Sequence, residues 1–302
     1  MPVIDVGGAL SWVRGRLTHL HPRGRRWLKF LRSLTLDPDA LPRPVAPPGP
    51  ADFIICGAPR TGTTLVSAML FQPPRVVTVM EPWDGMRLPP AQLFATIRES
   101  VARTGTLRYG KLDVEGLLEK GRVRWVKEGE STPALALEPE YLLGVKWPAF
   151  WRYLELLPRT KFLVCLRHPY EVISSFKKQG GRLVQGLNYD IAFNRRMNDE
   201  LKAATRSAAL RRVLLYDYVN ERILPHLGRE NVFTVRYERW FQEPETLLGE
   251  IGDFLGVELG SGPAAIRPPQ NEVELTAEEI ALVREHCRTA AALGYSLDDG
   301  GA

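Results

Sequence analysis

Short apolar runs recur along the chain from about residue 51 onward, and each is followed by a longer segment of mixed character. Five of these runs predict buried strands, at 52–56, 76–80, 142–146, 162–166 and 232–236. Consecutive apolar residues, as in Phe53-Ile54-Ile55-Cys56, suit a strand that is covered on both faces. The pattern therefore predicts a sheet buried between two layers of helices.

The segments between the strands predict helices at 63–71, 90–103, 149–157, 170–179, 190–206, 209–225, 244–255 and 276–292. Strands that alternate with helices indicate a mostly parallel sheet, because each return connection crosses over the sheet as a helix. We predict an α/β fold of three layers, with a mostly parallel sheet flanked by helices on both faces.

Residues 1–50 differ in character from the rest. We divide the chain into a basic N-terminal helical segment at 1–36, a Pro-rich linker at 37–50 and one domain at 51–302. We interpret the basic segment as a solvated helix that packs on the domain. The alternative is an amphipathic helix that lies on an anionic membrane. The glycine-rich stretch 104–140 indicates either an insertion on the substrate side of the domain or an ordinary surface loop.

Composition agrees with one large enzyme domain, since the chain has 302 residues and is 44% hydrophobic. Its 40 Lys and Arg against 35 Asp and Glu give a formal charge of +5, which attracts anions weakly and does not indicate nucleic-acid binding.

Cys56, Cys165 and Cys287 are odd in number and far apart, so we expect buried free thiols. With no apolar run of about eighteen residues and no signal-peptide core, we expect a cytoplasmic protein.

The loop after the first predicted strand has the pattern of an anion-binding turn. Gly57 and Gly62 stand five apart, and Thr63 and Thr64 begin the next helix. Glycines let the backbone turn its N–H groups inward, and the N-terminus of a helix favours a negative charge. A purely structural turn is the alternative. The coincidence of both glycines, the hydroxyls and a cation at Arg60 favours phosphate binding.

This loop differs from that of a nucleoside triphosphatase. Its spacing fits G-x-x-x-x-G-K-[ST], but Thr63 stands where that motif has lysine, and the cation is Arg60. A triphosphate site also needs a metal-binding acid on a nearby strand. The strand at 162–166 ends instead in a cation, Arg167. The pattern predicts a site for two anionic groups and no metal ion.

These motifs resemble those of sulfotransferases that use 3′-phosphoadenosine 5′-phosphosulfate (PAPS). The segment from Pro59 to Leu65 is similar to the family's 5′-phosphosulfate loop, and Arg167 with Ser175, eight residues later, is similar to its 3′-phosphate signature. Val235-Arg236-Tyr237-Glu238, followed by Phe254-Leu255-Gly256-Val257, is similar to a third family segment. The resemblance covers roughly 51–295 and is closest in style to bacterial, carbohydrate and tyrosylprotein members.

The resemblance implies a three-layer P-loop fold, PAPS as co-substrate and no metal. It implies that Arg60, Thr61, Gly62, Thr63 and Thr64 hold the 5′ end, that Arg167 and Ser175 hold the 3′-phosphate, and that Tyr237 lies near the adenosine. His168 is next to the phosphate arginine, and we favour a structural or phosphate-adjacent role for it. Arg267 is a candidate substitute for the family's late phosphate motif, which this chain lacks.

Glu81 and Lys146 are, with Arg60, the predicted catalytic residues. Glu81 follows a predicted strand and lies twenty-one residues after Arg60, similar to the catalytic glutamate of tyrosylprotein sulfotransferases. A general base is needed because the acceptor hydroxyl must lose its proton. Lys146 is similar to a family lysine near the transferring sulfuryl group. A salt-bridged or helix-capping Glu81 and a solvated Lys146 are the alternatives.

The sequence thus predicts transfer of a sulfuryl group from PAPS to a hydroxyl or amine. The acceptor class stays open among a glycan, a lipid-linked sugar, a peptide tyrosine and a small-molecule secondary metabolite. Two other functions compete with this one. A P-loop kinase or nucleotide phosphotransferase is disfavoured by the missing loop lysine and metal acid. A non-catalytic nucleotide-binding protein is disfavoured by the intact Glu81 and Lys146.

Overall fold

The computed structural model describes residues 52–86, 88–107, 111–113, 124–125, 134–179, 181–189, 192–260 and 273–298. The N-terminal segment, the linker and Arg267 lie outside these residues. So does most of the 104–140 insertion, within which β3 (Lys111–Asp113) pairs antiparallel with β4 (Arg124–Trp125).

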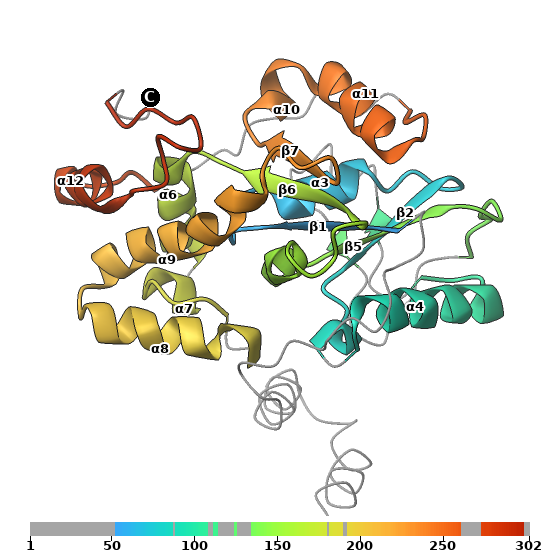
Figure 1. Cartoon of the computed structure of the whole chain (residues 1–302), viewed down its shortest axis with the longest axis horizontal. Coiled ribbons are helices and arrows are strands. Elements are labelled where there is room, and N and C mark those ends of the chain that lie inside the picture. Colours follow the sequence, from blue (N-terminus) through green and yellow to red (C-terminus); the bar gives the residue numbers. More distant parts are fainter. Residues whose placement is uncertain are drawn as a thin grey trace, which may run out of the picture.

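A five-stranded parallel sheet forms the centre of the domain (Figure 1). Its strands are β1 (Asp52–Gly57), β2 (Val76–Met80), β5 (Leu142–Lys146), β6 (Lys161–Leu166) and β7 (Val232–Arg236), in the order β2-β5-β1-β6-β7. Every pairing in this sheet is parallel. All five predicted strands are confirmed, and the α/β fold class with them.

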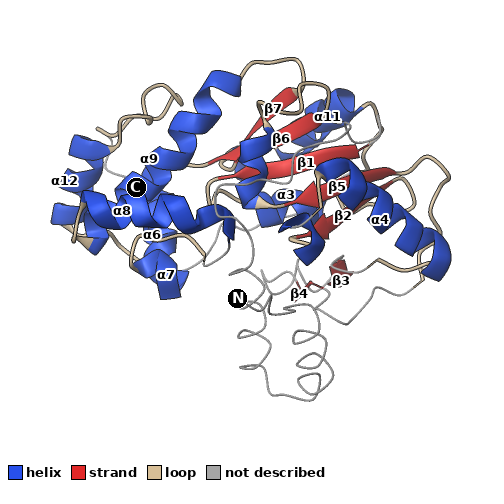
Figure 2. Cartoon of the chain, turned by 60° about the horizontal axis from the view of Figure 1, so that its bottom comes forward, coloured by secondary structure: helices blue, strands red, loops and turns tan. Residues whose placement is uncertain are grey.

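Helices cover both faces of the sheet, as Figures 1 and 2 show. The longer helices are α3 (Thr63–Met69), α4 (Pro90–Thr104), α6 (Pro169–Gln179), α8 (Arg195–Ala204), α9 (Ala208–Ile223), α11 (Pro244–Leu255) and α12 (Ala277–His286). The short ones are η1 (Trp83–Met86), η2 (Pro148–Tyr153), α7 (Gly181–Val184), η3 (Ala192–Asn194), η4 (Leu224–His226) and α10 (Arg239–Gln242).

The central strand β1 shows why the sheet is buried on both sides. Phe53 and Ile55 belong to one apolar cluster, which includes side chains of α3 and α11. Ile54 and Cys56 point the other way, into a larger cluster that includes side chains of α4, η2 and α9. Successive strand residues point to opposite faces, so a run of apolar residues fills both cores. Cys56 is one of three buried free thiols, as predicted.

Three predicted helices differ from the structure. The segment 149–157 is a 3₁₀ helix at Pro148–Tyr153, where positions three apart nearly eclipse and bring Phe150 and Tyr153 into edge-to-face contact at 5.2 Å. The described part of 190–206 begins with η3, and α8 starts only at Arg195. Helix α12 ends at His286, because the N–H groups of Arg288 and Thr289 donate to the buried Asp217 carboxylate.

Candidate active site

The predicted site residues gather at the carboxyl edge of the sheet, because parallel strands all end there. Arg60 follows β1, Lys146 ends β5 and Arg167 follows β6. Glu81 directly follows β2, whose Met80 pairs with Lys146. The strand order β2-β5-β1-β6 therefore lays these four side chains out in a row, with the acid at one end and Arg167 at the other.

The loop after β1 is shaped by its two glycines. Gly57 has φ 150° and Gly62 has φ 91°. A Cβ on Gly57 would lie 2.5 Å from the Cys165 carbonyl oxygen, and one on Gly62 would lie 2.4 Å from Cδ2 of Tyr237. Neither position has room for a side chain. The loop is therefore held tightly between β6 and the Tyr237 ring.

The loop hydroxyls divide into two groups. The Thr61 hydroxyl donates to the Ala58 carbonyl at 2.8 Å and is buried, so it braces the loop from within. Thr63 and Thr64 begin α3, and Gly62 precedes that helix with no side-chain cap bond. Thr64 is half-buried. Of the predicted phosphate-loop hydroxyls, Thr61 is thus given a structural role by the fold.

Arg60 reaches from this loop to the helix that carries Ser175. Its φ of 71° is uncommon for a residue with a side chain. Its Nε donates to the Ser175 hydroxyl at 3.0 Å. Burial lowers the pKa of Arg60, and the nearby Arg167 charge lowers it further, while the Tyr189 and Tyr237 phenols act in the opposite direction. Two guanidinium groups therefore share one confined space, which suits anionic ligands.

Arg167 is buried and held on two sides. Its Nε donates to Glu171 at 2.5 Å, one helical turn away on α6, and its guanidinium lies 4.2 Å from the centre of the Tyr237 ring. The Tyr216 hydroxyl donates to its carbonyl at 3.1 Å. These contacts fix the plane of the guanidinium. A fixed plane suits phosphate binding, because the guanidinium can then donate two parallel N–H bonds to the phosphate oxygens.

Glu81 and Lys146 form an ion pair with an Nζ–Oε1 distance of 2.5 Å. The Lys146 side chain is only 4% exposed, whereas that of Glu81 is 41% exposed. Glu81 also has a left-handed backbone, with φ 47°. A glutamate in this conformation is strained, and such strain is common at functional sites. The pair combines a buried cation with a carboxylate that solvent or a ligand can reach.

His168 is occupied by contacts within the protein. Its backbone N–H donates to Glu238 at 2.7 Å, and its Nε2 is 3.0 Å from the Ser296 carbonyl oxygen. The Tyr295 hydroxyl donates to the other Glu238 oxygen at 3.3 Å. These contacts tie the end of the described chain to the start of α6, and they agree with a structural role for His168.

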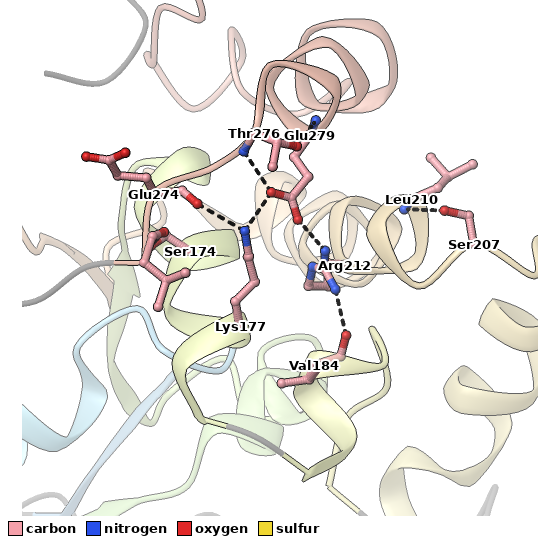
Figure 3. A network of polar contacts seen from close by, with 10 residues as sticks. Ser174, Lys177, Val184, Ser207, Leu210, Arg212, Glu274, Thr276 and Glu279 are labelled. Carbon is pink, nitrogen blue, oxygen red and sulfur yellow. Dashed lines mark hydrogen bonds and ion pairs between the residues drawn. The ribbon is translucent and has the colours of Figure 1, made fainter.

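A network behind α6 was not anticipated from the sequence (Figure 3). Glu279 of α12 accepts from Lys177 of α6 at 2.7 Å and from Arg212 of α9 at 2.5 Å. Lys177 lies only two residues beyond Ser175, and the Ser174 hydroxyl donates to the Val273 carbonyl at 2.6 Å. The capping box Thr276–Glu279 was readable in the sequence, but not its long-range partners. Helices α9 and α12 thus hold α6, the helix that carries Ser175.

Tyr189 is a second residue that the sequence did not single out. It is 45% exposed, and its phenol interacts electrostatically with both Arg60 and Glu81.

Within the described ranges, no group of three or more His, Cys, Asp or Glu side chains has the arrangement of a metal site. The same residues include no helix long and apolar enough to cross a membrane.

Among known proteins, the chain is 27% identical over 225 residues to the nodulation protein NoeE of Sinorhizobium fredii, covering 69% of this chain. The match spans 51% of NoeE, so the chain covers about half the length of that relative.

Several solved structures are similar to this one, among them two sulfotransferase structures. A sulfotransferase from Alicyclobacillus acidocaldarius is 17% identical with a TM-score of 0.42, and the match covers 82% of this chain and 95% of that one. The sulfotransferase domain of the curacin biosynthetic pathway is 20% identical with a TM-score of 0.41, covering 71% and 76%. The model of the sulfotransferase family matches residues 51–261, which is well over half of the 302 residues. The chain therefore belongs to the sulfotransferase family.

Proposed function

We propose that this protein transfers the sulfuryl group of PAPS to an acceptor hydroxyl or amine, with Glu81 as the general base. The observation that carries the proposal is the layout of the sheet edge. The Glu81–Lys146 pair lies at one end of it, and the Arg60–Ser175 contact and Arg167 lie at the other. Sulfuryl transfer needs a binding site for the acceptor and one for the anionic donor, and the two sites must adjoin where the group is transferred.

The donor side is built for two phosphate-type groups. We assign the 5′-phosphosulfate to the loop with Arg60, Gly62, Thr63 and Thr64, and the 3′-phosphate to Arg167 and Ser175. The hydrogen bond from Arg60 to Ser175 supports an assignment in which these two subsites are adjacent. The Tyr237 ring packs against both the loop at Gly62 and the Arg167 guanidinium, which supports its predicted place near the adenosine.

The chemistry follows from this arrangement. The acceptor oxygen forms a bond to sulfur while the bond from sulfur to the bridging phosphate oxygen breaks. Negative charge grows on that bridging oxygen, and loop N–H groups, hydroxyls and Arg60 stabilise it. The proton of the acceptor goes to Glu81. The Lys146 bond uses Oε1 of Glu81, so we assign proton transfer to Oε2.

Lys146 has two tasks in this scheme. It holds the Glu81 carboxylate in one orientation, and it places a buried positive charge beside the sulfuryl group. Its side chain is 4% exposed, so that charge is poorly screened by water.

A cavity of about 390 Å³ is lined by residues of α4 and by Pro82, the residue after Glu81, and we propose it as part of the acceptor side. Glu81 itself is not among its lining residues. Helix α4 contributes most of its lining, with apolar residues such as Ile97 and polar ones such as Ser100 and Glu99. A cavity of mixed polarity suits a hydroxylated organic acceptor better than a purely apolar one.

Ligand-dependent unfolding tests the donor assignment. The desulfated product, 3′,5′-adenosine bisphosphate, should stabilise the protein in the presence of a chelator, by about 2.7 kcal/mol at a hundredfold excess over its Kd. Turnover is then sought with isotopically labelled PAPS and a panel of hydroxylated acceptors. Stabilisation by ATP with Mg²⁺, and none by the bisphosphate, would instead favour a P-loop kinase.

A further inference from the structure

The segment 293–297, which we call the strap, follows α12 and lies against the start of α6 (Figure 1). Tyr170, in the first turn of α6, donates its hydroxyl hydrogen to the Leu297 carbonyl at 2.9 Å. Arg236, the last residue of β7, donates to the Leu293 carbonyl at 2.6 Å. The strap therefore ties the start of α6 to the end of β7, beside the proposed 3′-phosphate subsite.

Three consecutive residues, beginning with the last residue of β7, divide their contacts between the strap and this subsite. The Arg236 guanidinium lies 5.0 Å from the centre of the Tyr295 ring. The ring of Tyr237 has its centre 4.2 Å from the Arg167 guanidinium. The Glu238 carboxylate accepts from the Tyr295 hydroxyl at 3.3 Å. A shift of the strap would therefore reach Tyr237 through both of its neighbours in the chain.

The Glu238 carboxylate links the strap to the backbone beside Arg167. Its Oε1 accepts from the His168 backbone N–H at 2.7 Å, and its Oε2 accepts from the Tyr295 hydroxyl. A carboxylate that accepts a hydrogen bond on each oxygen is held in one orientation. His168 directly follows Arg167, so this carboxylate holds the backbone from which the Arg167 side chain extends.

The His168 side chain contacts the strap as well. Its Nδ1 accepts from the Tyr170 N–H at 3.3 Å, so Nε2 of the neutral ring carries the proton and donates to the Ser296 carbonyl at 3.0 Å. The centres of the His168 and Tyr295 rings are 5.3 Å apart, in an edge-to-face arrangement. His168 is therefore held through its backbone by Glu238 and through its ring by the strap.

The Tyr295 hydroxyl is the donor in its bond to Glu238. Burial raises the pKa of this phenol and Glu238 raises it further, whereas Arg236 lowers it, and the net result is a rise. The hydroxyl is therefore protonated at physiological pH. A phenylalanine at this position would keep a ring beside His168 and Arg236 and would remove the bond to Glu238.

We propose that Tyr295 is a positioning residue for the 3′-phosphate subsite and that it acts through Glu238 to fix Arg167. The inference rests on the proposed function and deepens it, because it explains how the site selects a nucleotide that carries a 3′-phosphate. Without the Tyr295 bond, Glu238 holds His168 and Tyr237 less firmly. A guanidinium that must be ordered on binding recognises phosphate with lower affinity.

Calorimetry with 3′,5′-adenosine bisphosphate and adenosine 5′-phosphate tests the inference, since these nucleotides differ only in the 3′-phosphate. Tyr295→Phe should reduce the preference for the bisphosphate by about three- to tenfold, as expected for one intramolecular hydrogen bond. The affinity for adenosine 5′-phosphate should stay close to that of the wild type. A merely structural role would weaken both nucleotides alike, and that result would overturn the inference.

Tyr141→Phe is the matched control. The rings of both tyrosines have an arginine guanidinium over them, with Arg98 at 4.5 Å from the centre of the Tyr141 ring and Arg236 at 5.0 Å from that of Tyr295. Tyr141 precedes β5 and lies at the amino edge of the sheet, opposite the candidate site. This control should keep the wild-type preference, and an equal loss of preference in it would overturn the inference.

A double-mutant cycle decides whether Tyr295 acts through Glu238. Glu238→Ala removes both of the bonds that this carboxylate accepts, and it should itself reduce the preference for the bisphosphate. Tyr295→Phe should then have no further effect on the preference in the Glu238→Ala background. A further loss of the same size as in the wild-type background would show that Tyr295 acts by another route, and would overturn the inference.

The wild-type measurement separates this inference from the proposed function. If the wild type prefers the bisphosphate and Tyr295→Phe keeps that preference unchanged, the inference alone is overturned. If the wild type binds neither nucleotide, or binds both equally well, it has no 3′-phosphate subsite, and this result would contradict the proposed function and the inference together.

Discussion

Lys146 and Glu81 hold each other through both side chain and main chain: the amine lies 2.5 Å from Oε1, and the Glu81 N–H donates to the Lys146 carbonyl at 2.8 Å. The backbone bond continues the pairing of β2 with β5 by one residue past Met80. The left-handed turn at Glu81 then directs its side chain back toward the lysine. The sheet register itself thus positions the proposed base.

Glu81→Gln should reduce turnover by about 10²- to 10⁴-fold, the usual effect of removing a general base. The amide keeps the shape of the side chain but cannot accept the proton. The affinity for 3′,5′-adenosine bisphosphate should be unchanged, because Glu81 faces the acceptor. Glu140→Gln is a suitable control, since Glu140 is exposed and precedes β5 at the opposite edge. Near-normal turnover of Glu81→Gln at saturating PAPS would remove Glu81 from this role.

Lys146→Ala should lower both turnover and PAPS affinity, because it removes a buried positive charge beside the sulfuryl group. This double effect separates it from Glu81→Gln, which should affect turnover alone. Lys202→Ala, at an exposed surface ion pair, should affect neither. Loss of turnover in Lys146→Ala with unchanged PAPS affinity would restrict Lys146 to orienting Glu81.

Arg167→Ala should weaken 3′,5′-adenosine bisphosphate by about 10- to 150-fold, which corresponds to a charge-assisted hydrogen bond of about 1.5–3 kcal/mol. Adenosine 5′-phosphosulfate lacks the 3′-phosphate, so its affinity should change little. Arg167→Lys should rescue only part of the loss, because lysine keeps the charge but lacks the planar fork that lies over the Tyr237 ring. Calorimetry on both ligands is the measurement, and equal weakening of the two would contradict the assignment.

The fold was predictable because its signals are local. The apolar runs of β1 and β6, and the glycines that follow β1, are properties of short stretches of sequence. The predicted helix at 149–157 was wrong for a related reason: an apolar, aromatic stretch reads equally well as an α-helix, and packing of Phe150 on Tyr153 selects the 3₁₀ form.

The site was predictable only where it coincides with a strand end. Arg60, Lys146 and Arg167 each follow or end an apolar run, so topology alone brings them together. Tyr189 lies on a connection, and nothing in its neighbours indicates that Arg60 is near. The buried contacts of Glu279 with Lys177 and Arg212 join residues 102 and 67 positions apart, a separation that no periodicity encodes.

Gly62→Ala tests the contact between the loop and Tyr237. The added methyl would lie 2.4 Å from the Tyr237 ring, whose displacement also disturbs the stacked Arg167. We expect loss of nucleotide affinity beyond any loss of stability. Gly228→Ala is matched for backbone strain, since its φ is 80°, but nothing lies within 4 Å of its added methyl. The difference between the two variants therefore isolates the contact. Equal effects of both on nucleotide affinity would show that backbone strain alone matters.

Glu279→Gln should destabilise the protein by about 3–5 kcal/mol at neutral pH, because it leaves the buried Arg212 and the largely buried Lys177 without their counter-charge. Burial alone would raise the pKa of Glu279. The bonds from Lys177 and the Thr276 N–H, with the charges of Lys177 and Arg212, outweigh burial and lower that pKa. A depressed folded-state pKa gives stability above the unfolded value of about 4.3, and this stability is lost as the pH falls further.

The free energies of unfolding of wild type and Glu279→Gln should therefore differ most above pH 5 and converge in acid. Denaturant titrations across this pH range measure the difference, with the exposed neighbour substitution Glu278→Gln as control. Since Lys177 and Ser175 share α6, the variant should also weaken 3′,5′-adenosine bisphosphate under conditions where it is still folded. A stability difference that does not depend on pH would show that the ionised carboxylate is not what holds α6 to α12.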